Sequence, residues 1–135
     1  IWAVTKKNPL KAESKTPIPK KIKDCKKIIG MNSFIKVKFY ENIIKSNKTI
    51  DLINYLKKNK NIEIFFLMGA DNLISFHKWH KSKLISQKCN IIVFDRHGYK
   101  KNSLKSKTFK RLNNKTLTFV EFKKVNISSS QLRKI

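Results

Sequence analysis

The sequence predicts an α/β fold, specifically a Rossmann-like doubly wound parallel sheet with helices on both faces. Short apolar segments with the composition of buried strands alternate with segments whose apolar residues recur at helical spacing. Connections of this kind between parallel strands are right-handed crossovers, which build doubly wound sheets. The 135 residues fit one domain, and a hydrophobic fraction of 40% can supply its core.

The first half of the chain is expected to hold two strands and two helices. Residues 1–5 (IWAVT) form an apolar strand, and a loop with two prolines follows over residues 12–19. Apolar residues at helical spacing predict a helix over residues 22–30, with Gly30 as its C-terminal stop. Partial alternation over 33–41 (SFIKVKFYE) predicts a strand, and TIDLINYLKK predicts a helix over residues 49–58.

The second half is expected to hold three strands, over residues 62–68, 90–94 and 117–122. The first of them, IEIFFLM, has the continuous apolar character of a strand buried on both sides. Asp71 is expected to begin a helix that continues through residues 78–87. Residues 99–116 are basic and poor in core residues, which predicts a mobile charged loop, and residues 126–135 open a last helix.

A net charge of +24 raises the alternative of a nucleic-acid-binding module. The distribution of the charge favours a lysine-rich composition spread over solvated positions instead. Lysines occur in every kind of segment, aromatic residues do not interleave with them, and arginine occurs only at positions 96, 111 and 133. We therefore predict no specific nucleic-acid partner.

The cysteine pattern and the hydropathy favour a cytoplasmic protein. Cys25 and Cys89 are the only cysteines and lack the spacing of a metal cluster, which favours reduced thiols. No apolar run approaches the ~20 residues that a membrane span requires, and no signal peptide is visible.

Three strand ends carry unusual residues, and ligands of open α/β sheets bind beyond such ends. At the first, Gly69 lets a ligand approach the backbone and Asp71 can accept hydrogen bonds from ribose hydroxyls; the alternative is a simple turn with an Asp cap. The second is the run from Asp95 to Gly98. The third is ISSSQLR, where serines at a helix N-terminus and Arg133 favour a phosphate over an ordinary serine cap.

Trp79 stands in a basic, polar neighbourhood. Its indole would suit stacking on a cationic pyridinium ring, and the alternative is a half-buried side chain that covers the edge of the domain. His77 and His80 are spaced to reach one metal ion, but no third ligand of suitable spacing follows, so we predict no metal site. His97 is more simply a turn residue.

The chain resembles the bacterial nicotinate-nucleotide adenylyltransferases, which belong to the nucleotidyltransferase superfamily with a Rossmann-like fold. Five segments carry the resemblance in order: IWAVTKKNPLK, KTIDLI, FFLMGADNLISFHKWHK, IIVFDRHGY and ISSSQLR. The ISSS–R element is shared with related adenylyl- and cytidylyltransferases. The GADNL…FHKW segment followed by DRxGY is particular to the nicotinate-nucleotide branch.

The resemblance implies transfer of AMP from ATP to nicotinate mononucleotide, with Mg²⁺, giving deamido-NAD and pyrophosphate. On the ATP side, Gly69 and Asp71 would hold a ribose. The phosphates of ATP would be gripped by Ser128, Ser129, Ser130 and Arg133.

On the nicotinate side, the resemblance implies that Trp79 stacks on the ring. Thr49 and the backbone at His80 would receive the carboxylate. Three further residues match polar or basic positions around this nucleotide: Asn8, Lys11 and Arg96.

The chain departs from the family pattern in three places. The family's Gly-rich loop with its His-x-Gly-His element has no counterpart, so we expect residues 1–135 to be a single nucleotidyltransferase domain that lacks its N-terminal strand and this loop, and the catalytic residues stay unassigned. Lys48 replaces the usual Tyr, and Ser130 replaces the usual Thr. A sister enzyme, such as a pantetheine-phosphate adenylyltransferase, is a further alternative, although it has no use for FHKW.

Overall fold

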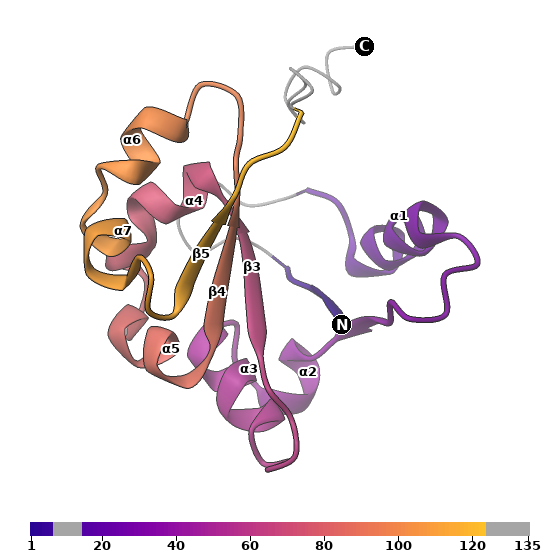
Figure 1. The fold of residues 1–135 in the computed structure, drawn as a ribbon. Helices are drawn as coiled ribbons and strands as arrows, with labels where there is room; N and C mark the ends of the chain where they lie inside the picture. The colour runs from indigo at the N-terminus through magenta and orange to yellow at the C-terminus, as the bar shows by residue number, and fades with distance from the viewer. Residues whose placement is uncertain (7–14, 124–135) are drawn as a thin grey trace. The chain divides into compact units, whose positions relative to one another are not determined.

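The computed structural model describes residues 1–6 and 15–123. The chain divides into two compact units, Ile1–Lys60 and Asn61–Ile135, which we call the N-terminal and C-terminal units. Each unit contains a parallel sheet with helices in the connections between its strands (Figure 1). The predicted α/β class is confirmed.

The N-terminal unit begins with a β–α–β motif. Strand β1 (Trp2–Val4) pairs in parallel with β2 (Val37–Phe39), and α1 (Ile18–Ile29) connects them. The helix stops at Gly30, as predicted, because this residue takes a φ of 54° that favours glycine, and its N–H donates to the Lys26 carbonyl at 3.1 Å.

Two helices follow in the same unit, α2 (Glu41–Ile44) and α3 (Thr49–Leu56). The sequence predicted α3 but not the single turn of α2. Tyr40, which precedes α2, packs its ring on Tyr55 of α3 with centroids 5.8 Å apart. Burial raises the pKa of the Tyr40 phenol, and the neighbouring Tyr55 raises it further, so this phenol stays protonated at neutral pH.

The C-terminal unit is built on a three-stranded parallel sheet in the order β3-β4-β5. Its strands are β3 (Phe65–Gly69), β4 (Asn90–Phe94) and β5 (Leu117–Val120). The first connection holds α4 (Ala70–Ser75), the 3-10 helix η1 (Phe76–Lys78) and α5 (Ser82–Lys88). The second holds α6 (Lys100–Leu104) and α7 (Lys107–Leu112).

The core of this unit lies between one face of the sheet and these helices (Figure 1). The sheet contributes Met68, Ile91, Val93 and Leu117, and the first connection contributes Ala70, Leu73, Phe76 and Ile85. Both crossovers step in the same direction along the sheet, so right-handed connections place their helices on the same face.

The expectation that residues 62–68 are buried on both sides is wrong. Phe65 and Leu67, on the opposite face of β3, are 53% and 58% exposed. Their side chains alternate with the buried Met68 and point away from the helices of this unit. A continuous apolar run therefore did not indicate two covered faces here.

Two further expectations for this unit are corrected. The helix predicted from Asp71 through residues 78–87 is broken, because Trp79 is extended and Lys81 adopts a left-handed conformation with φ 54°. The segment 99–116, predicted as a charged loop, holds α6 and α7 instead. Ser103, Thr108 and Leu112 are buried there, so packing stabilises helices that apolar periodicity alone did not indicate.

No helix within residues 1–6 and 15–123 combines the length and the apolarity that crossing a bilayer requires. Cys25 lies in the N-terminal unit and Cys89 in the C-terminal unit, and both are thiols.

Candidate functional site

The register of the sheet brings two predicted site residues together. Gly69, the last residue of β3, pairs with Phe94, the last residue of β4. Asp71 and Arg96 each follow two residues later, so they leave adjacent carboxyl ends of parallel strands. This edge of the sheet is where ligands of α/β proteins bind.

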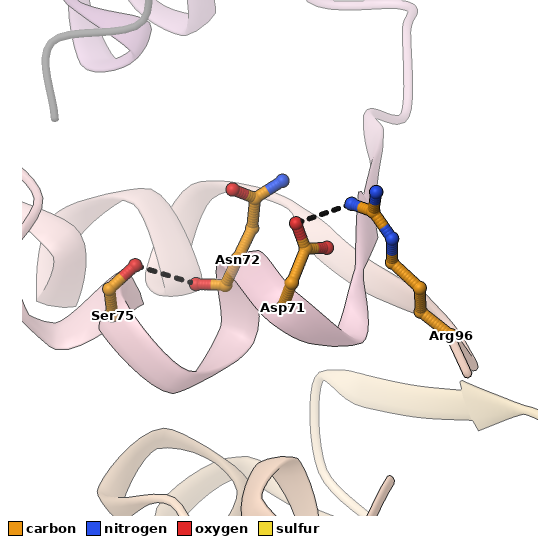
Figure 2. A network of polar contacts seen from close by, with 4 residues as sticks. All are labelled: Asp71, Asn72, Ser75 and Arg96. Carbon is orange, nitrogen blue, oxygen red and sulfur yellow. Dashed lines mark hydrogen bonds and ion pairs between the residues drawn. The ribbon is translucent and has the colours of Figure 1, made fainter. Parts of the chain in front are cut away.

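Arg96 and Asp71 form an ion pair (Figure 2). Nη1 of Arg96 donates to Oδ2 of Asp71 at 2.6 Å, which is a short, charge-assisted hydrogen bond. The Asp71 side chain is 13% exposed and that of Arg96 is 40% exposed. The aspartate is therefore enclosed, and the guanidinium is open to solvent on one side.

Asp71 does not cap α4, in contrast to the alternative raised from the sequence. Gly69 is the N-cap residue of α4, and Asp71 stands in the first turn without a side-chain capping bond. Its second oxygen, Oδ1, is buried and has no hydrogen-bond partner among the described residues. A buried carboxylate oxygen in this state keeps an unused capacity to accept a hydrogen bond.

Gly69 is required by the position of this carboxylate. A Cβ on Gly69 would lie 2.5 Å from Oδ1 of Asp71, closer than non-bonded atoms approach. The absence of a side chain at position 69 thus leaves room for Asp71 itself, in addition to any room it leaves for a ligand.

A tight turn after β4 holds Arg96 in place. The Tyr99 N–H donates to the Arg96 carbonyl at 3.0 Å, and Gly98 inside the turn has a φ of 81°, which favours glycine. The turn brings the Tyr99 ring beneath the guanidinium, with Cζ of Arg96 5.7 Å from the ring centroid. The DRHGY segment therefore positions one arginine through its backbone and its aromatic residue.

A second ion pair lies one residue beyond this turn. Lys100 Nζ lies 2.7 Å from Oε1 of Glu121; the lysine side chain is 41% exposed and the glutamate side chain 62% exposed. The hydrogen bond to Glu121 raises the pKa of Lys100 above its usual value, so this lysine is charged throughout the neutral range. A raised folded-state pKa stabilises the protein below the unfolded pKa, and this contribution is lost only as the pH rises through the folded-state pKa.

Trp79 packs on the buried face of the sheet. Its ring centroid lies 6.0 Å from that of Phe66 in β3 and 5.4 Å from that of Phe76 in η1. Its Nε1 is buried without a hydrogen-bond partner among the described residues, while the side chain as a whole is half-buried. One side of the indole is thus fixed by aromatic contacts, which is compatible with both interpretations that the sequence left open.

The other predicted site residues belong to one unit or the other, or lie outside the described residues. His80 is exposed next to Trp79, and Thr49 is the first residue of α3 in the N-terminal unit. Among the described residues no group of three or more potential metal ligands occurs, so His77 and His80 gain no third ligand there. Six predicted residues lie outside the described ranges: Asn8, Lys11, Ser128, Ser129, Ser130 and Arg133.

The structure adds two residues to which the sequence analysis gave no role. Tyr99 contacts Arg96 as described, and the DRHGY motif already contained the signal. Asn72 follows Asp71 in the GADN segment, and Figure 2 shows its side-chain amide on the same side of α4 as the Asp71 carboxylate.

Comparisons with known proteins show the family to which the chain is related. The cytidylyltransferase-like family matches residues 1–135. A probable nicotinate-nucleotide adenylyltransferase of Pelagibacter ubique is 66% identical over 135 residues, which are the whole chain and 75% of that protein. A protein of the same name from Agrobacterium fabrum is 35% identical over 72% of the chain and 52% of its own length.

Solved structures share the fold. A Plasmodium falciparum nicotinic acid mononucleotide adenylyltransferase complexed with NaAD gives a TM-score of 0.70 over 98% of this chain and 66% of that chain, at 21% identity. The enzyme complexed with APC gives 0.68 over 88% and 62%, at 23% identity. This chain therefore spans three quarters of the Pelagibacter relative and about half of the Agrobacterium one.

Proposed function

The chain belongs to the cytidylyltransferase-like family and, within it, to the nicotinate-nucleotide adenylyltransferases, and from this premise we propose that it transfers an adenylyl group from ATP to nicotinate mononucleotide. The products are deamido-NAD and pyrophosphate, which places the reaction in NAD biosynthesis. The observation that carries the proposal is the 66% identity to a nicotinate-nucleotide adenylyltransferase over the full chain.

The reaction requires no covalent intermediate with the protein. A phosphate oxygen of nicotinate mononucleotide attacks the α-phosphorus of ATP and forms the new O–P bond. The bond from the α-phosphorus to the oxygen bridging to the β-phosphorus breaks, and its electron pair leaves with pyrophosphate. ATP enters as its Mg²⁺ complex, and the protein supplies positioning and positive charge.

The proposed roles divide between the two nucleotides. Asp71 accepts a hydrogen bond from a ribose hydroxyl of ATP, because a carboxylate attracts donors and repels phosphates. Trp79 stacks on the nicotinate ring, and Thr49 and the backbone at His80 receive its carboxylate. The phosphates of ATP are held by the serines of the ISSS segment with Arg133, and Asn8 and Lys11 lie around the nicotinate nucleotide.

The cytoplasm is the proposed location, supported by the thiol state of both cysteines. The proposal includes neither a specific nucleic-acid partner nor a membrane partner.

The proposal is tested by incubating the full chain with ATP, Mg²⁺ and nicotinate mononucleotide and measuring deamido-NAD and pyrophosphate by chromatography. Equal amounts of the two products are expected. A chain that binds neither substrate would overturn the proposal. Formation of a product with pantetheine phosphate in place of nicotinate mononucleotide would transfer the chain to the sister enzymes.

Variants separate the two nucleotide subsites in the same experiment. Trp79→Ala is expected to weaken binding of nicotinate mononucleotide by ~10-fold or more with little effect on ATP, because a desolvated cation–π contact contributes ~2 kcal/mol. Arg133→Ala is expected to weaken ATP binding selectively. Phe65→Ala, which truncates a 53% exposed aromatic ring in the same unit, is the matched control and should change neither. Equal losses for both nucleotides in Trp79→Ala would contradict the stacking role.

A further inference from the structure

We infer that Arg96 acts as a positioning residue that orients the Asp71 carboxylate toward a ribose hydroxyl of the bound nucleotide. This inference rests on the proposed function and deepens it, because it reassigns Arg96 from contact with the nicotinate nucleotide to control of Asp71. It rests on the contacts of three residues in the C-terminal unit, Asp71, Arg96 and Tyr99.

The first step is that the two carboxylate oxygens of Asp71 have different surroundings. Oδ2 is occupied by Arg96 at 2.6 Å. Oδ1 is buried and has no partner among the described residues. The hydrogen bond to Arg96 opposes rotation of the carboxylate plane. Arg96 therefore fixes the direction in which the second oxygen points.

The second step is the restraint on the arginine. Its backbone is held by the turn that closes with the Tyr99 N–H, and its guanidinium rests over the Tyr99 ring at 5.7 Å. Restraint of a long side chain before a ligand arrives lowers the entropy lost on binding. The orientation of Arg96 is thus set before a ligand binds, by Tyr99, which lies three residues further along the sequence.

The third step is electrostatic. An uncompensated carboxylate at this edge of the sheet would repel the phosphates of ATP. The Arg96 guanidinium compensates that charge, while Oδ1 keeps its capacity to accept a hydrogen bond. The pair can therefore select for a hydroxyl donor and tolerate a polyanion beside it.

The experiment compares ATP with 2′,3′-dideoxy-ATP, both with Mg²⁺, by isothermal titration calorimetry on the full chain. The unsubstituted protein is expected to bind ATP ~10-fold or more tightly than the dideoxy analogue, because hydrogen bonds to charged groups are strong. Asp71→Ala should remove this preference, so that both nucleotides bind with about equal affinity. Arg96→Ala should reduce the ratio to the value of Asp71→Ala, and Arg96→Lys should restore part of it, because a lysine keeps the charge but not the planar fork.

The matched control is Arg111→Ala, which removes an exposed arginine of α7 in the same unit and should leave the ratio unchanged. If the role of Arg96 is merely structural, Arg96→Ala will weaken the binding of ATP and of 2′,3′-dideoxy-ATP equally. The ratio of the two affinities will then stay as in the unsubstituted protein. That outcome would overturn the inference, as would a direct phosphate contact, which gives the same uniform loss. If Arg96→Ala fails to fold, Arg96→Lys and Arg96→Gln carry the same comparison.

Failure of the inference and failure of the proposed function give different results. A protein that forms deamido-NAD but binds ATP and 2′,3′-dideoxy-ATP equally tightly overturns the inference alone. A protein that binds neither ATP nor nicotinate mononucleotide overturns the proposed function, and the inference with it.

Discussion

Gly69 and Asp71 act as one unit at the scale of single residues. The glycine ends β3 and starts α4, and the carboxylate of Asp71 occupies the space that a side chain at position 69 would fill. The result is an enclosed aspartate with one oxygen paired with Arg96 and one that has no partner in the described part of the chain. Glycine is common at strand ends. At position 69 it is needed because a Cβ would lie 2.5 Å from Oδ1 of Asp71.

Gly69→Ala is expected to displace the Asp71 carboxylate and to break its ion pair with Arg96. The added methyl group would meet Oδ1 at 2.5 Å, and overpacking of this kind reduces the free energy of unfolding by ~1–3 kcal/mol. Urea denaturation measures the loss, and an ATP titration should show a parallel loss of affinity.

Gly30→Ala is the control for that substitution. A Cβ there meets no atom of the described residues within 4 Å, but the left-handed φ of 54° strains any side chain. It should destabilise the protein through backbone strain, with no change in ATP affinity once the protein is folded. An unchanged ATP affinity in Gly69→Ala would show that the carboxylate has room to move.

The helices of the C-terminal unit show where element-level reasoning from sequence succeeds and where it does not. The run after Asp71 is helical in its first turns, and then η1, the extended Trp79 and Lys81 interrupt it before α5 begins. The interruption lets Trp79 pack on Phe66 and Phe76. A continuous helix would have followed local propensity, and tertiary packing overrides it.

Helix α7 begins with a serine cap that the sequence analysis did not use. Oγ of Ser106 accepts a hydrogen bond from the Phe109 N–H at 3.1 Å, three residues into the helix. Ser106→Ala is expected to reduce the free energy of unfolding by ~1 kcal/mol. Ser106→Thr keeps an acceptor and should retain most of the stability in the same urea experiment.

Ser33→Ala removes an exposed hydroxyl outside any helix and is the control for the cap. A stability loss in Ser33→Ala as large as in Ser106→Ala would mean that the cap of α7 contributes nothing particular. The comparison also tests whether α7 is a stable helix in solution.

At the scale of the whole molecule, the dominant property is the net charge of +24. It attracts any polyanion and therefore any nucleotide, whatever the site that finally binds it. The proposed function requires a nucleotide site, whereas the charge alone predicts a general affinity for nucleic acids. The two effects differ in their dependence on salt.

We expect weak RNA binding that is independent of sequence and falls steeply with salt, by ~10³–10⁵ between about 50 and 200 mM if six to ten phosphates are contacted. Fluorescence anisotropy with two labelled RNAs of different sequence measures it. ATP binding should fall much less over the same range. Tight binding of one RNA and not the other at physiological salt would instead support the nucleic-acid-binding alternative.

The sequence predicted much of the candidate site, but not its contacts. The strand ends at Gly69-Ala70-Asp71 and at Asp95–Gly98 were identifiable because an apolar run followed by small and charged residues is a local pattern. The ion pair of Asp71 with Arg96 was not, because it depends on which residues of β3 and β4 stand side by side. The ISSS segment, Arg133, Asn8 and Lys11 stay predictions.

By itself, the sequence determined the α/β class, the positions of the main strands and the family, since periodicity and short motifs are properties of neighbouring residues. Only the tertiary structure decided the pairing of Asp71 with Arg96 and the packing of Trp79 on two phenylalanine rings. The same is true of the helices α6 and α7 and of the exposed face of β3. The physical reason is that these features arise where segments distant in the sequence pack together, and packing selects among conformations that local propensity leaves nearly equal in free energy.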